Sequence, residues 1–131
     1  MESMQIGWLA VVVAAVVNQI IGFLWFSKWG FGQKWLKLRG MREEKKGVGS
    51  KALLSFINSL VIAFFISFFE VRLEVLSIAD GVLFGFLIWL GFVATTQISG
   101  VIWGKKPFEL FVINTGYKLL SLLVMGGIIA A

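Results

Sequence analysis

Four long stretches with few or no charged side chains constrain this 131-residue chain more than any other feature. Three of them contain no Asp, Glu, Lys or Arg: residues 3–27, 52–69 and 81–104. The fourth, residues 108–131, carries only Glu109 and Lys118. A helix needs about 20 apolar residues to cross the hydrocarbon core of a bilayer, and the stretches do not alternate as barrel strands do. The sequence therefore predicts an all-α integral membrane four-helix bundle, a single membrane domain over residues 1–131 with spans at about 6–26, 52–69, 79–103 and 108–129.

The composition supports the same class of protein. Hydrophobic residues make up 59% of the chain and charged residues 15%, whereas a typical soluble domain has about 45–50% apolar and about 25% charged residues. A chain this short cannot bury so much apolar surface in one core, so the excess must face lipid. There is no Cys and no His, which excludes disulfides, thiol redox chemistry, haem ligation and the usual zinc sites. We expect no cofactor and no metal site, and a first span that is retained because it lacks the basic start of a signal peptide.

The basic residues predict the orientation in the membrane. Ten of the twelve Lys and Arg residues lie in two connections that share one side, residues 28–51 and 104–107. Arg72 lies on the other side and Lys118 inside a span. Basic residues in short loops stay in the cytoplasm, so we expect a multi-pass protein of the cell (cytoplasmic) membrane with cytoplasmic basic loops and both termini outside. Anionic lipid headgroups are the expected partners of the 28–51 loop. Three glycines argue against a long helix in this loop: Gly30, Gly32 and Gly40.

An internal duplication is a further prediction. Residues 19–28 and 97–106 end the first and third spans, and five of their ten positions are identical. Residues 54–59 of the second span match residues 110–115 of the fourth at a Leu, an Ile, an Asn and a hydroxyl residue. The two halves are then related helical hairpins in a parallel 2+2 repeat, with a pseudo-two-fold axis along the membrane normal.

Four side-chain amides lie at similar depth in the predicted spans, roughly 9–12 Å from the inner boundary at about 1.5 Å per residue: Gln19, Asn58, Gln97 and Asn114. In lipid, such groups should face the bundle interior and find hydrogen-bond partners. We favour the simpler interpretation, a hydrogen-bonded layer that fixes the register of the helices. The functional alternative is a polar binding site between the two halves, open to the cytoplasm.

Lys118 is the least expected residue of the fourth span. It lies twelve residues after Lys106, about 18 Å into the membrane and near the middle of the hydrocarbon. A charge there costs about 2.5–3.5 kcal/mol, and such residues usually mark a function or a specific partner. No acidic residue occurs at that depth, and Tyr117 is adjacent. Three states of Lys118 stay open: a neutral amine, an ammonium that reaches outward along its stem, or one that holds an anionic group.

The chain also resembles a known family over nearly its whole length. Residues 25–27 and 31–35, Trp-Phe-Ser and Phe-Gly-Gln-Lys-Trp, are similar to the "W-Y-S-P … F-G-K-x-W" signature of the bacterial and archaeal membrane family called domain of unknown function 1761. Residues 91–95 and 108–126, with Ile113-Asn114-Thr115-Gly116-Tyr117, are similar to its C-terminal half. Lys28 stands where the family usually has proline, and Lys118 where a histidine is expected. The resemblance implies a four-helix fold and supplies no activity.

Two functional hypotheses are consistent with these features. The first is a small transporter or channel-like protein for an anionic or neutral small solute, a homodimer because four short helices enclose little volume. Its candidate binding residues are Gln19, Asn58, Gln97, Asn114, Tyr117 and Lys118. The alternative is a non-transporting accessory, interaction or lipid-binding membrane protein. The spans contain no nucleophile–base pair and no paired carboxylates, so we expect no enzyme, and we expect no nucleic-acid partner.

Overall fold

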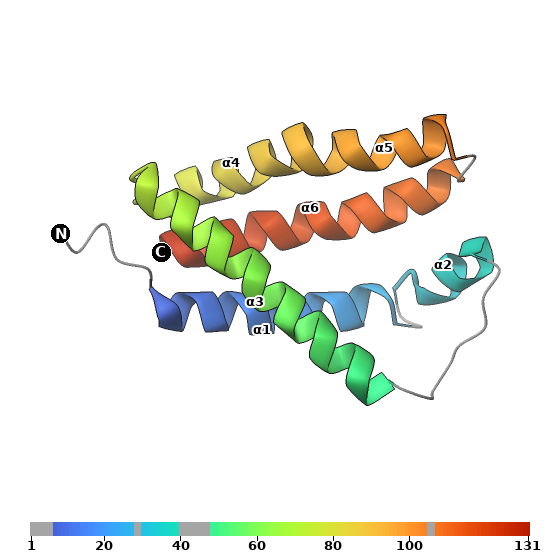
Figure 1. Cartoon of the computed structure of the whole chain (residues 1–131), viewed down its shortest axis with the longest axis horizontal. Coiled ribbons are helices and arrows are strands. Elements are labelled where there is room, and N and C mark those ends of the chain that lie inside the picture. Colours follow the sequence, from blue (N-terminus) through green and yellow to red (C-terminus); the bar gives the residue numbers. More distant parts are fainter. Residues whose placement is uncertain (1–6, 28–29, 40–47, 105–106) are drawn as a thin grey trace.

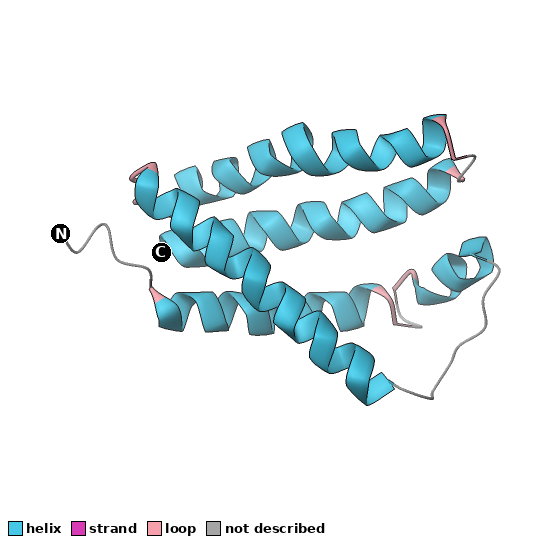
Figure 2. Cartoon of the chain, viewed as in Figure 1, coloured by secondary structure: helices cyan, strands magenta, loops and turns pink. Residues whose placement is uncertain are grey.

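The computed structural model describes residues 7–27, 30–39, 48–104 and 107–131, and the regular elements in these ranges are all helices (Figure 1, Figure 2). In chain order they are α1 (Trp8–Trp25), α2 (Gly32–Arg39), α3 (Val48–Arg72), α4 (Ile78–Ile88), the π-helix η2 (Trp89–Ala94), α5 (Thr95–Ile102) and α6 (Phe108–Ala130). α4, η2 and α5 follow one another without a break and form one long rod. The predicted all-α four-helix architecture is confirmed.

Four helices in the described ranges are long and apolar enough to cross a membrane: residues 8–25, 49–72, 78–102 and 108–130. These bounds lie within a few residues of the predicted spans. The predicted start of the first span at Ile6, and residues 28–29 and 40–47 of the predicted basic loop, lie outside the described residues. Many large apolar side chains point outward, among them Leu9 and Phe92. In water such a surface is unstable, so the architecture is compatible with a multi-pass membrane protein.

α6 lies at the centre of the bundle. Figure 1 shows α6 between the α4–α5 rod and α1, with α3 crossing α1 and α6 obliquely. α6 packs most extensively on α4 and also contacts α1 and α3, whereas α3 meets α4 only slightly. Small residues on α1 and α3, Ala14, Ala15 and Ala63, let these two helices approach closely. The buried core comes from α1, α3 and α6 and consists of Val11, Ala14, Ala15, Ala63, Ile66, Leu122 and Met125.

Glycines bring α4 and α6 into backbone contact. A Cβ added at Gly85 would collide with the carbonyl oxygen of Leu122, and one added at Gly81 with the carbonyl oxygen of Gly126. Gly81 and Gly85 are one helical turn apart, so they present a flat strip to α6. Close packing of backbones through small residues is how helices associate where the hydrophobic effect between them is absent.

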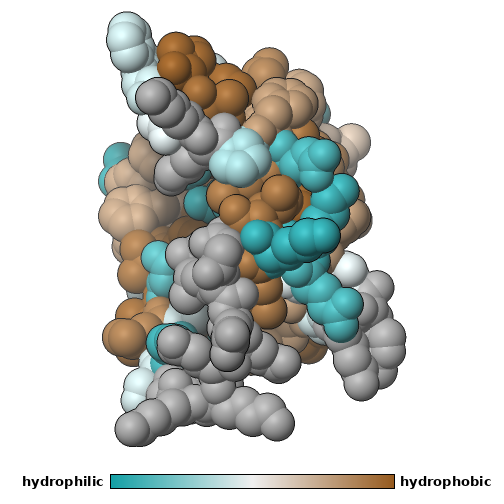
Figure 3. Space-filling view, turned by 90° about the vertical axis from the view of Figure 1, so that its right-hand side faces the viewer, coloured by the Kyte–Doolittle hydropathy of each residue, from teal (hydrophilic) through white to brown (hydrophobic). Residues whose placement is uncertain are grey.

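The end of the bundle that carries α2 is polar and aromatic. Phe26 packs against Trp35, and Trp25 against Phe31. Lys34 of α2 forms an ion pair with Glu109 of α6 at 3.1 Å. Figure 3 views this end, where hydrophilic residues gather beside hydrophobic flanks. Within the described part of the basic loop, eight residues, Gly32–Arg39, form a short helix.

The π-helix changes the rotation of the third span at mid-length. A π-helix has one more residue per hydrogen-bonded turn than an α-helix, and such segments are often found at functional sites. Two threonines after it donate side-chain hydrogen bonds back to carbonyl oxygens of its wide turns: Thr95 to Gly91 and Thr96 to Phe92. Trp89 at its start donates from Nε1 to the carbonyl oxygen of Thr115 at 2.8 Å. The rod is thereby joined to α6 beside η2.

The residues paired by the predicted duplication have different surroundings. Trp25 of α1 is half-buried and donates from Nε1 to the carbonyl oxygen of Ile113 at 3.0 Å. Its counterpart Trp103 follows α5 and is 85% exposed. The duplication stays a prediction.

Candidate functional site

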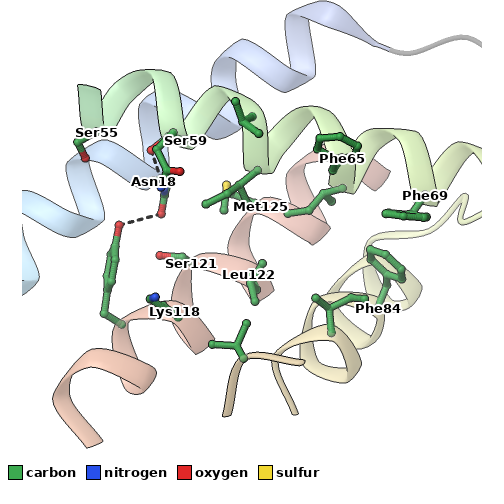
Figure 4. A pocket seen from close by; sticks show the side chains of 17 residues that line it. Asn18, Ser55, Ser59, Phe65, Phe69, Phe84, Lys118, Ser121, Leu122 and Met125 are labelled. Carbon is green, nitrogen blue, oxygen red and sulfur yellow. Dashed lines mark hydrogen bonds between the residues drawn. The ribbon is translucent and has the colours of Figure 1, made fainter. Parts of the chain in front are cut away.

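A cavity of about 480 Å³ opens between α3, α6 and the α4–η2 part of the rod, with α1 at one end. Figure 4 shows its lining. This volume is within the range of about 300–1,000 Å³ typical of small-molecule sites. Its lining is Asn18, Ser55, Asn58, Ser59, Val61, Ile62, Phe65, Ile66, Phe69, Phe84, Ile88, Val93, Tyr117, Lys118, Ser121, Leu122 and Met125.

A chain of hydrogen bonds holds the α1 end of the cavity together. Tyr117 Oη of α6 donates to Asn18 Oδ1 at 3.2 Å, and Asn18 Nδ2 donates to Ser59 Oγ of α3 at 2.8 Å. Asn18 is 4% exposed and Ser59 2% exposed. Gly22, one turn after Asn18, leaves room for the Tyr117 hydroxyl, which would lie 3.0 Å from a Cβ at that position. The three side chains therefore fix three helices relative to one another at one depth.

Lys118 lies at the same end of the cavity, on the central helix. It is the eleventh of the 23 residues of α6, so the structure places it near the middle of that span. Figure 4 shows its nitrogen beside Ser121. Among the described residues Lys118 has no ion-pair partner. Ser121 is buried, and its hydroxyl has no hydrogen-bond partner within the described residues. The amino group of Lys118 and the hydroxyl of Ser121 thus face the cavity with capacity for a ligand.

The opposite end of the cavity is apolar. Phe65 and Phe69 of α3 and Phe84 of α4 lie there, and Leu122 and Met125 of α6 lie between them and the polar residues (Figure 4). The polar lining residues of α3 and α6 come earlier in each helix than the apolar ones, and both helices run in the same direction. The polarity of the cavity therefore changes along its length.

The predicted site residues separate into two groups. Lys118, Tyr117 and Asn58 line the cavity, with Asn58 on its exposed side. The remaining three do not line it: Gln19, Asn114 and Gln97.

These three amides have other surroundings. Gln19 Nε2 donates to the Ala52 carbonyl oxygen at 3.0 Å, and its Oε1 accepts from Ser55 Oγ at 3.1 Å. Asn114 Oδ1 accepts a hydrogen bond from Trp35 Nε1 of α2 at 3.0 Å. Gln97 is exposed on α5. The described hydrogen bonds of Gln19 and Asn114 are therefore with residues outside the four predicted amides.

Four polar residues of the cavity lining were not among the predicted site residues: Asn18, Ser55, Ser59 and Ser121. A signal for Asn18 does exist in the sequence. Val11, Ala14, Ala15 and Asn18 are spaced i, i+3, i+4, i+7, which places Asn18 on the small-residue face of α1. The neighbouring Gln19 is rotated by about 100° from that face.

Glu70 is a second buried polar group, away from the cavity lining. It lies near the C-terminal end of α3 and is 2% exposed. Its Oε1 lies 3.5 Å from where a Cβ on Gly126 would be. Neither carboxyl oxygen has a hydrogen-bond partner among the described residues.

Replacing Trp35 with phenylalanine tests the attachment of α2 to α6. The change removes the indole donor to Asn114 and keeps an aromatic ring against Phe26. One neutral hydrogen bond contributes about 0.5–1.5 kcal/mol, so we expect amide exchange in residues 32–39 to rise roughly two- to tenfold. Hydrogen exchange read by mass spectrometry measures it. Trp103→Phe, the same change at an exposed site, is the control and should leave these residues unaffected.

Comparison with known proteins places the chain in a family. A search of curated proteins and a search of solved structures found no match. A family model described as a protein of unknown function, DUF1761, matches residues 9–130. The match covers nearly all of the four long helices and the cavity between them, and it confirms the resemblance seen in the sequence motifs. The chain therefore belongs to the DUF1761 family.

Proposed function

We propose that this protein binds an anionic or neutral small solute in the cavity at Lys118 and carries it across the cell membrane. The observation that supports this most is the position of Lys118: it lies in the middle of the central helix, lines the cavity, and has no ion-pair partner among the described residues. The proposal assigns no chemical reaction to the site.

The energetic argument starts from the charge. A lysine at mid-membrane costs about 2.5–3.5 kcal/mol, and residues of this kind usually line a solute path or hold a counter-ion. A lysine that only extends its stem toward the membrane surface (snorkelling) needs no cavity. Lys118, by contrast, lines a cavity together with Ser121 and Asn58. These neighbours offer hydroxyl and amide groups that hydrogen-bond anionic and neutral solutes alike. A bound anion would compensate the desolvated cation.

The proposed orientation follows the basic residues. Lys34, Lys37 and Lys51 lie at the end of the bundle that holds α2 and the start of α3, and Arg72 at the other end. With the α2 end in the cytoplasm, both termini lie outside and the polar end of the cavity is the end nearer the cytoplasm. A homodimer is part of the proposal, since the cavity between the four helices is small.

α3 is the element whose movement would change access to the cavity. It crosses α1 and α6 obliquely and has little contact with α4. The Asn18–Ser59 hydrogen bond joins it to α1 beside the polar end. A tilt of α3 about this point would open one end of the cavity and close the other, as rocking bundles do in other transporters.

A flux experiment tests the proposal. Purified protein in liposomes is given labelled carboxylates of two to twelve carbons and the matching neutral amides. We expect uptake of at least one of them above that of empty liposomes, and a tenfold or larger loss in Lys118→Met because the cation is removed. Lys37→Met, the same change on the exposed face of α2, is the control and should transport normally. Equal uptake by Lys118→Met and the unmodified protein would contradict the proposed role of the cavity.

A non-transporting, lipid-binding role is the second candidate. It is favoured by one observation: three apolar residues of α3 that line the cavity, Val61, Phe65 and Phe69, are each about half exposed. If ligands bind to Lys118 but no solute crosses the liposome membrane at any pH or potential, this second function replaces transport.

A further inference from the structure

The cavity is amphipathic along its length, and this property restricts its occupant. On α3 the lining begins with Ser55, Asn58 and Ser59 and continues with Ile62, Phe65, Ile66 and Phe69. On α6 it begins with Tyr117, Lys118 and Ser121 and continues with Leu122 and Met125. A small hydrophilic solute would contact only the polar half of the cavity. A ligand that fills the whole cavity must have a polar head and an apolar tail.

The length of the apolar part matches a lipid chain. From Ser59 to Phe69, α3 rises about 15 Å at 1.5 Å per residue. The hydrocarbon core of a bilayer is about 30 Å thick, so the apolar part equals about the depth that the chains of one leaflet occupy. The cavity volume of about 480 Å³ is that of a single small ligand, in the lower half of the usual range of about 300–1,000 Å³.

The opening of the cavity faces the side of the bundle. Val61, Phe65 and Phe69 line the cavity and are each about half exposed, at 49%, 50% and 47%. They lie on α3 along the gap that its small contact with α4 leaves. In a bilayer this gap lies at the level of the hydrocarbon, so an apolar tail can enter from lipid without crossing water.

The charge of the cavity selects the head group. Lys118 is the only Lys, Arg, Asp or Glu side chain among the described residues of the lining. One ammonium with the Ser121 hydroxyl and the Asn58 amide suits a carboxylate, which has one charge and two acceptor oxygens. A cationic head would meet like charge and no acid.

We propose that the occupant is a single-chain amphiphile with a carboxylate head, which enters sideways from the bilayer with its head at Lys118 and its chain along Phe65, Phe69 and Phe84. The inference rests on the proposed binding site at Lys118, and it holds whether or not the ligand is then transported. The hydrocarbon tail of the ligand points away from the α2 end of the bundle. With that end in the cytoplasm, the ligand has the head-to-tail direction of an inner-leaflet lipid, but its head lies closer to the middle of the membrane.

A photolabelling experiment on the full-length protein tests this. The protein is placed in nanodiscs of phosphatidylcholine with dodecanoate that carries a photoreactive diazirine near its methyl end. We expect crosslinks in peptides that contain Phe65, Phe69 or Phe84. Unlabelled dodecanoate should compete, whereas dodecanol and dodecyltrimethylammonium at the same mole fraction of lipid should compete at least tenfold less. This comparison requires no variant.

Three variants locate the head and two locate the tail. Lys118→Met should lower labelling tenfold or more, Lys118→Arg should retain most of it, and Lys37→Met should leave it unchanged. Phe84→Trp narrows the apolar end and should shift the preference from dodecanoate to octanoate. Phe92→Trp, an exposed position on the same rod outside the cavity, is the matched control and should keep the original preference.

The outcomes separate this inference from the proposed function. Equal competition by the carboxylate and the cationic amphiphile overturns the carboxylate head. Equal competition by butyrate and dodecanoate at the same mole fraction overturns the apolar tail and leaves the small-solute site intact. Labelling that depends on Lys118, with no flux of any solute, overturns transport and leaves the amphiphile site intact.

Discussion

Gly85→Val is expected to separate α4 from α6 and to give the largest loss of stability of any single change considered for this protein. The added Cβ collides with the backbone carbonyl of Leu122, which cannot move aside as a flexible side chain can. Overpacking of this kind costs about 1–3 kcal/mol and occasionally more. We place Gly85→Val at or above the upper end of that range, because α4 and α6 form the most extensive helix contact.

Gly91→Val is the matched control. Gly91 lies on the same rod, in η2, and a Cβ added there meets nothing within 4 Å. Thermal unfolding in detergent, followed by the tryptophan fluorescence, measures both variants. The Trp89 indole, which donates to the Thr115 carbonyl, should report the separation through a shifted emission. Equal stability of the two variants would show that α4 and α6 do not touch at Gly85.

Asn18→Leu is expected to give the second large effect, since it removes the link between three helices. Tyr117 Oη and Ser59 Oγ both lose their partner on Asn18. Interhelical hydrogen bonds in membranes contribute about 0.6 kcal/mol on average and about 1.7 at most, and two are lost here, so we expect a fall of about 1–3 kcal/mol. Binding at Lys118 should weaken as well, because this end of the cavity loses its fixed shape.

A double-mutant cycle isolates the contact. Asn18→Leu and Ser59→Ala are combined, and their free energies of unfolding are measured in the same detergent. We expect a coupling energy of about 0.6–1.7 kcal/mol between them. Asn58→Leu is the control: Asn58 is one residue from Ser59 and exposed, so its change should couple to Asn18→Leu by less than about 0.5 kcal/mol. A coupling energy of zero would contradict the proposed role of the buried Asn18 in linking the helices.

The spans and the depth of Lys118 could be predicted from the sequence because both depend on counting residues. Length and hydropathy locate a membrane helix, and the rise per residue then gives the depth of a side chain. Which way a side chain points depends on the rotation of its helix, and apolar residues surround these helices on all sides. Counting residues therefore predicts Gln19 as a site residue, whereas it is the neighbouring Asn18 that faces the interior.

Gln97 shows a second reason why a predicted site residue does not line the cavity. The prediction treated residues 79–103 as one regular α-helix, but η2 inserts wide turns just before Gln97. Each residue gained or lost in a helix rotates the remainder of that helix by about 100°. No residue pattern in Trp89–Ala94 signals this change. The short α2 could not be predicted either, because its Trp35 is held by Phe26 and Asn114, of which Asn114 is distant in sequence.

The central position of α6 has a consequence for biosynthesis. α6 is the last of the four long helices to leave the ribosome, yet α1, α3 and α4 all pack on it. Arg72 at the end of α3 precedes Ala130 by 58 residues, which at about 5–20 residues per second takes roughly 3–12 s to synthesise. During that interval α1 and α3 can pair with each other, while α4 lacks α6, the helix on which its glycines pack. Insertion of α6 is then the step that assembles the bundle.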